Sequence, residues 1–130
     1  MEEIYAKSIE ELDGNPWGEP PPDATGLVER VHRLRTVKVR DLSDDDISTL
    51  LGQREGAEWL VPLALDRLAD DPLAGAFYPG HLLVGVLLNR QYFERFPNEL
   101  LRLSSIRREL TKLRDDADDV LANPDWPSGI

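Results

Sequence analysis

The sequence contains no cysteine, which excludes disulfide bonds and metal sites built on thiolates. Histidine is scarce as well, since His32 and His81 are the only two. Neither belongs to a metal-binding motif, and a zinc site would need further ligands that no spacing in the sequence suggests. We interpret both as surface or helix-end residues, and we predict no metal and no other cofactor.

Long apolar runs are also absent. The longest, residues 82–88, is far shorter than the roughly 20 residues that a helix needs to cross a bilayer. The first residues, MEEIYAKSIEEL, are acidic and lack the apolar segment of a signal peptide. We therefore expect a cytoplasmic protein with no membrane partner, and the lack of cysteine fits that compartment.

Basic residues are few beside the acidic ones. Fifteen lysines and arginines face 25 aspartates and glutamates, which gives a net charge of −10. This charge opposes binding to a phosphate backbone and would steer a cationic partner toward the protein. Acidity also serves solubility, so the charge alone does not identify a partner. Residues 42–68 loosely resemble a helix-turn-helix, but their second helix is acidic and contains Pro62, so we expect no nucleic acid partner.

Motifs of catalysis are missing too. No serine lies in a GxSxG motif, and no glycine-rich phosphate loop occurs. Carboxylate pairs are numerous, but they fall at the predicted ends and exposed faces of helices, where a solvated role is the simpler reading. We therefore assign no catalytic residue and do not expect an enzyme.

The apolar spacing is helical, and 41% apolar residues suffice for one folded core. We predict a single compact all-α domain of about five helices. Its helices are expected near residues 25–35, 43–52, 55–69, 81–89 and 97–122. Residues 8–23 are expected to form an extended proline-rich arm, residues 24–122 the helical core, and residues 123–130 a tail anchored by Trp126.

Several details of these helices can be predicted. Thr25 and Ser43 suit N-caps, and Pro62 either kinks the third helix or begins a later one. Phe77 and Tyr78 are expected to tuck into the core. The run HLLVGVLLN is apolar all round and should be a central helix covered on every side.

The last helix carries apolar residues spaced three and four apart over residues 103–120. This heptad seam is short, so we expect it to pack against the rest of the domain. A homodimer through the same residues stays open, and the protein is therefore either a monomer or a dimer.

The arm from residue 9 to residue 23, IEELDGNPWGEPPPD, is too polar and proline-rich for a helix. Trp17 is too large an apolar residue to be left in a disordered tail, so we expect it to pin the arm to the domain. The arm also carries several carboxylates. A chemically specific surface arm of this kind suggests binding rather than catalysis.

The order of the motifs resembles one family. The chain reads LDGNPWGEPPPDATGLVERVHRLR, then LSDDDISTLLGQREGAEWLVPLALDRLADDPLA, then FYPGHLL. Over residues 8–88 this set is similar to the immunity proteins of contact-dependent growth inhibition (CDI). His81 stands where an acidic residue is common in that family, and the helix over residues 103–120 is not part of the resemblance.

The resemblance implies a small cytoplasmic bacterial protein that binds and neutralises the C-terminal toxin domain of a cognate effector. Such toxins are often nucleases, and an acidic protein could occupy their positive cleft. On charge clustering we expect seven acidic residues to contact the toxin: Glu10, Glu11, Asp13, Glu19, Asp44, Asp45 and Asp46. The alternative function is a helical scaffold or regulatory module with a partner other than a toxin.

Overall fold

The computed structural model describes residues 2–75, 77–125 and 127. These residues form an all-α fold without strands, which confirms the predicted fold class. The helices in chain order are α1 (Glu2–Tyr5), α2 (Ile9–Asp13), α3 (Gly26–Leu34), the 3₁₀ helix η1 (Val39–Asp41), α4 (Asp44–Gly52), α5 (Ala57–Asp70), α6 (His81–Leu87), α7 (Arg90–Arg95), the 3₁₀ helix η2 (Pro97–Glu99) and α8 (Leu100–Leu121).

The two predicted N-caps are confirmed. The side chain of Thr25 accepts a hydrogen bond from the backbone N–H of Val28 at the start of α3. Ser43 forms a capping box with Asp46 at the start of α4. Pro62 lies inside α5, so the alternative in which it begins a later helix is wrong.

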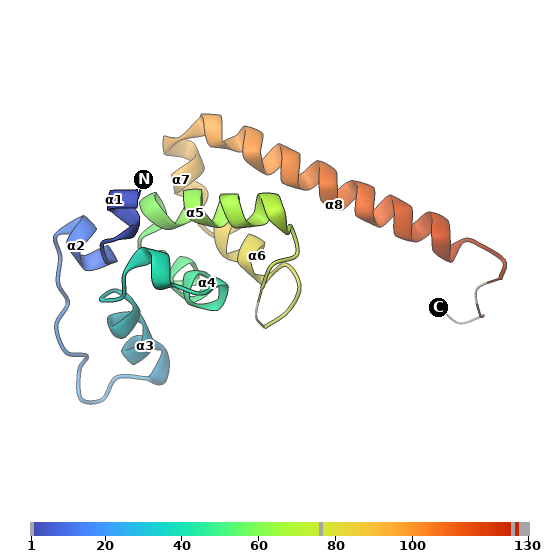
Figure 1. Ribbon diagram of the computed structural model, residues 1–130. Coiled ribbons are helices and arrows are strands. Elements are labelled where there is room, and N and C mark those ends of the chain that lie inside the picture. Colours follow the sequence, from blue (N-terminus) through green and yellow to red (C-terminus); the bar gives the residue numbers. More distant parts are fainter. Residues whose placement is uncertain (1, 76, 126, 128–130) are drawn as a thin grey trace.

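Helix α4 is the centre of the core. Ile47, Leu50 and Leu51 are completely buried, as their spacing predicted, and α4 packs against both α5 and α6. Figure 1 shows α3 on one side of this group and α8 lying along α5 on the other. The chain is thus a cluster of short helices with one long helix laid across it.

The arm differs from the prediction in its first third, where Ile9–Asp13 forms α2. A capping box between Ser8 and Glu11 starts this helix, and Gly14 at φ 66° ends it. Ile9 is fully buried. A five-residue helix held by its caps and one buried side chain is too short to reveal itself by apolar spacing, and the arm is extended only after it.

Two expectations of burial were wrong. Phe77 and Tyr78 are exposed, and both rings instead lie against His81 at the start of α6. Helix α6 buries Leu82 and Val86 on α4 and α5, but its other side is open to solvent. Its apolar circumference predicted cover on every side, which the neighbouring helices do not provide.

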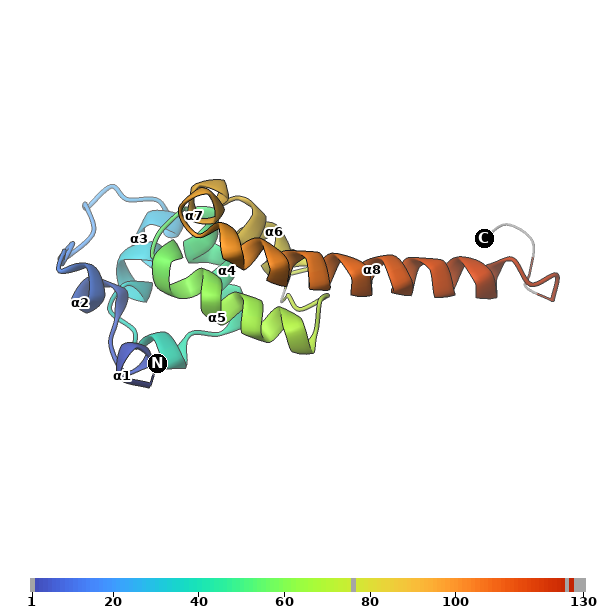
Figure 2. The ribbon, with the colours of Figure 1, turned by 90° about the horizontal axis from the view of Figure 1, so that it is seen from above.

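Helix α8 is longer than the domain beneath it. Its 22 residues span about 33 Å, against about 21 Å for the 14 residues of α5 on which it packs. Ile106 is buried, whereas Leu113 is 52% and Val120 54% exposed. The expectation that the whole seam packs on the domain was wrong, because its second half extends past the domain (Figure 2).

The expected anchor of the tail, Trp126, lies outside the described residues. Among the helices that the structure describes, none is long and apolar enough to cross a membrane.

Replacing Gly56 with alanine should lower stability more than the same change at Gly14. Both glycines have positive φ, 70° and 66°, so each variant bears a backbone cost of about 1 kcal/mol. A Cβ at Gly56 would also lie 2.6 Å from Cδ1 of the buried Ile9, whereas a Cβ at Gly14 meets nothing. Urea unfolding of the two variants measures the difference, and equal losses would contradict the close packing of α2 on Gly56.

Candidate functional site

The seven predicted contact residues fall into two groups. The arm acids, Glu10, Glu11, Asp13 and Glu19, lie on α2 and the extended segment after it. The α4 acids, Asp44, Asp45 and Asp46, form the first turn of α4, where negative charge suits the positive end of the helix dipole. Each group faces arginines of neighbouring helices.

Arg35 at the end of α3 organises the arm. Its side chain is fully buried, and its guanidinium donates hydrogen bonds to the Asp13 carboxylate at 2.7 Å and to the Glu55 carboxylate at 2.8 Å. The carbonyl of Asn15 accepts a third at 2.8 Å. The ring of Trp17 lies over the same guanidinium, 4.4 Å from its central carbon. Trp17 therefore pins the arm, as predicted, by covering a buried cation.

His32 completes this anchor from the last turn of α3. Its ring meets the Trp17 ring edge-on, with centroids 5.0 Å apart. Its Nδ1 lies 3.1 Å from the carbonyl oxygen of Gly18 and so can donate to it. His32 is thus a structural residue at the edge of the arm, which agrees with our interpretation of it.

The α4 acids are paired with arginines of α3 and α5. Arg30 binds Asp45 at 2.8 Å and Asp46 at 3.1 Å, and Arg67 binds Asp44 at 2.7 Å. Partial burial alone would raise the pKa of Asp46, but hydrogen bonds from Ser43 and Arg30 outweigh it and hold that pKa below its ordinary value. Asp46 is therefore a cap and an ion-pair partner at once.

The four arm acids differ in whether they have internal partners. Glu11 belongs to the capping box of α2, and Asp13 to the Arg35 cluster. Within the described part of the chain, the side chains of Glu10 and Glu19 enter no ion pair and no hydrogen bond, whereas Glu11 meets no cation but is held by Ser8. Of the seven candidates, these two carry charge that is free for a partner.

The two groups do not form one continuous patch around α3. Arg30 and Arg35 are five residues apart, so their side chains leave the helix about 140° apart. The arm acids lie near Arg35 and the α4 acids near Arg30. A partner that contacts both groups has to reach around the α3 helix.

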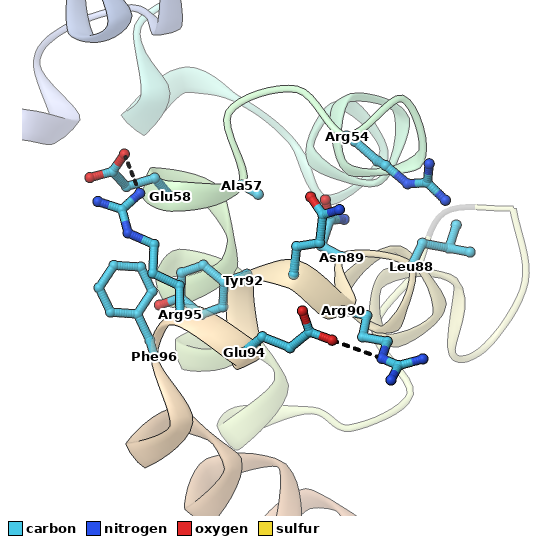
Figure 3. A pocket seen from close by; sticks show the side chains of 11 residues that line it. Arg54, Ala57, Glu58, Leu88, Asn89, Arg90, Tyr92, Glu94, Arg95 and Phe96 are labelled. Atoms are coloured by element: carbon cyan, nitrogen blue, oxygen red, sulfur yellow. Dashed lines mark ion pairs between the residues drawn. The ribbon is translucent and has the colours of Figure 1, made fainter.

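A separate cavity of about 590 Å³ opens between the start of α5, the end of α6 and α7 (Figure 3). Arg54, Arg90 and Arg95 line it, together with Glu58 and Glu94. Arg90 pairs with Glu94 at 3.1 Å and Arg95 with Glu58 at 3.7 Å. Its lining is polar and aromatic, and among the described residues no cluster of three potential metal ligands occurs there or elsewhere.

Arg35 was missed as a key residue by sequence reasoning. It follows Val31 by four residues and therefore shares the inner face of α3 with that buried side chain. This position could have revealed it, because an arginine on the inner face of a helix must either be buried with carboxylate partners or turn its side chain out to solvent. The sequence left open that the basic residues 30–40 pair internally with the acidic arm or with Asp44–Asp46, but it did not single out Arg35 as the buried one.

Comparison with known families gives the decisive observation. A family model of CDI immunity proteins matches residues 11–103, more than half of the chain. The chain belongs to the CDI immunity protein family. No curated protein and no solved structure matches it.

The family match covers most of this immunity protein but only the beginning of its last helix. It includes most of the arm, the Arg35 cluster and α3 to α7, and it ends in the first turn of α8 at Leu103. The resemblance noted over residues 8–88 is thereby confirmed from residue 11 onward and extended to residue 103. The second half of α8, with its exposed seam, lies beyond the part shared with the family.

Replacing Arg35 with alanine should destabilise the immunity protein by about 3 kcal/mol, because it leaves two partly buried carboxylates without their partner. Arg30 is a matched control, since it also binds two carboxylates but is 26% exposed. Its alanine variant should lose less than about 1 kcal/mol. Chemical unfolding of both variants measures these losses. Equal losses would mean that the Arg35 cluster is not the anchor of the arm.

Proposed function

We propose that this protein binds the C-terminal toxin domain of a cognate CDI effector and neutralises it. Membership of the CDI immunity family is the observation that carries the proposal. The fold is consistent with a binding role, because the described residues present anchored charged surfaces. Neutralisation by binding needs no chemical step, so the protein acts as an inhibitor and not as an enzyme.

The toxin that we propose is a nuclease. A nuclease must offer a positive cleft to its nucleic acid substrate, and this protein carries a net charge of −10. Complementary charge accelerates encounter, which suits an inhibitor that has to capture a toxin before it acts. We place this encounter in the cytoplasm, where such a toxin meets its substrate.

The contact surface that we propose consists of the arm acids and the α4 acids. Glu10 and Glu19 contribute the free charge, because neither carboxylate has an internal ion-pair or hydrogen-bond partner among the described residues. Asp44, Asp45 and Asp46 contribute carboxylates held in place by Arg30 and Arg67. Glu11 and Asp13 chiefly hold the arm, so we assign them the smaller share of affinity.

A co-expression experiment tests the function. Cells that express the toxin fragment encoded beside this protein's gene should survive when this protein is produced with it. The matched control is a non-cognate immunity protein of the same family, which should give no protection because specificity lies in the surface. Equal killing with and without this protein would overturn the proposal.

A double charge reversal tests the surface. The variant Glu10→Lys/Glu19→Lys should bind the toxin fragment at least about tenfold more weakly, while its thermal midpoint changes little. The control Glu109→Lys/Asp125→Lys changes the net charge equally at exposed acids outside the family match. Calorimetric titration compares the two. If both variants lose the same affinity, only the overall charge matters and the assigned surface is wrong.

A further inference from the structure

The exposed half of α8 carries an apolar seam that the described residues leave uncovered. Leu110, Leu113, Ala117 and Val120 follow one another at spacings of three, four and three. Leu110 is half-buried, and the other three are exposed among the residues that the structure describes. Figure 2 shows this part of α8 extending alone beyond the domain. A regular seam of this kind fits a second helix.

The charges along α8 are divided between its halves. The basic residues come first: Arg102, Arg107, Arg108, Lys112 and Arg114. The acidic residues follow: Asp115, Asp116, Asp118 and Asp119, with Glu109 the exception in the first part. Lys112 and Arg114 are the basic residues of the exposed half, so a second α8 running in the opposite direction would lay its aspartates along them, whereas a parallel copy would place aspartate beside aspartate.

The domain itself also favours the opposite direction. Ile106 and Leu103 belong to the same seam, and they pack on the core of their own domain. A parallel second helix would have to continue along the seam into that domain. An antiparallel helix that pairs only with residues 110–121 approaches the domain with its C-terminal end, where the chain leaves the helix after Leu121.

We propose that two copies of this protein associate through the second half of α8, side by side and antiparallel. The seam sets the register: Leu110 meets Val120 of the second copy, and Leu113 meets its Ala117. In this register residue 115 lies at the two-fold axis, so Arg114 lies beside both Arg114 and Asp118 of the second copy on one flank. Lys112 lies beside Asp116 and Asp119 of that copy on the other flank.

An apolar groove between α6 and α8 lies where the C-terminal end of the second helix would reach the domain. It has a volume of about 460 Å³, and Leu83, Leu87 and Leu110 are among the residues that line it. Because Val120 of the second copy lies opposite Leu110, it reaches the mouth of this groove. The groove and the seam thus form one apolar surface, shared by symmetry between the two copies.

The association should be weak, since the paired segments of 12 residues are only about 18 Å long. Sedimentation velocity from about 10 μM to about 1 mM should show a concentration-dependent dimer. The variant Leu113→Asp/Val120→Asp should raise the dissociation constant at least about 100-fold, because it puts charges in the seam. Leu113 and Val120 are both exposed in the monomer, so the circular dichroism spectrum of the variant should remain that of a helical protein.

The control Leu101→Asp changes an exposed leucine on the same helix but outside the seam, and it should dimerise like the original chain. A chain that stays monomeric at about 1 mM overturns the proposal. So does a dimer that survives Leu113→Asp/Val120→Asp. If the chain is monomeric and that variant instead weakens toxin binding, the seam serves the toxin and the proposal is likewise overturned.

Disulfide trapping tests the direction, and the absence of native cysteine makes it clean. Chains with Leu110→Cys mixed with chains carrying Val120→Cys should cross-link to each other under mild oxidation, since these positions face each other only in the antiparallel pair. Chains with Leu110→Cys alone should remain unlinked. Efficient linkage of Leu110→Cys to itself would mean a parallel pair and would overturn the antiparallel arrangement.

Discussion

The buried guanidinium of Arg35 is the interaction on which the arm of this protein depends. It joins three segments distant in sequence: the end of α3, the arm through Asp13 and Asn15, and the α4–α5 connection through Glu55. A cation away from water needs compensating charge, and the arm supplies one carboxylate, one carbonyl and the face of Trp17. The proline-rich segment is therefore held in place by its contacts with the Arg35 guanidinium more than by burial of its own apolar surface.

Local signals in the sequence were sufficient for the parts of the fold that are decided locally. The caps at Thr25 and Ser43 and the buried stripe of α4 could be predicted because a cap needs only its own first turn and a stripe only a period. The helix α2 was missed because a five-residue segment shows no period. The exposure of α6 and of Phe77 depended on which elements come to cover them, and apolar character alone does not state that.

The candidate site could be predicted only as a set of charges. The basic residues 30–40 were open as internal partners of these acids, but the individual pairs could not be read from the sequence, because they join residues 15 to 23 positions apart along the chain. Once those partners are known, the residues differ in kind. Asp13 and Asp46 hold the fold together, while Glu10 and Glu19 present charge to the outside.

The division between structural and free acids bears on the contact surface that we propose. An acid that pairs with an internal arginine is needed for the stability of the fold, since its loss leaves the arginine charge without a partner. Residues without such a tie can change from member to member at little cost to folding. On the proposed function, the residues that contact a toxin can therefore change while the frame stays constant.

The order of charges along α8 has a consequence for the helix itself. The C-terminal end of a helix carries partial negative charge, so Asp118 and Asp119 lie where acidic residues are least favourable, and the last turn has no basic residue to offset them. The final turns also lack the packing that supports the first half. Helical order in this segment should thus rise whenever cations are brought to its end, and binding and folding of the last turns are coupled.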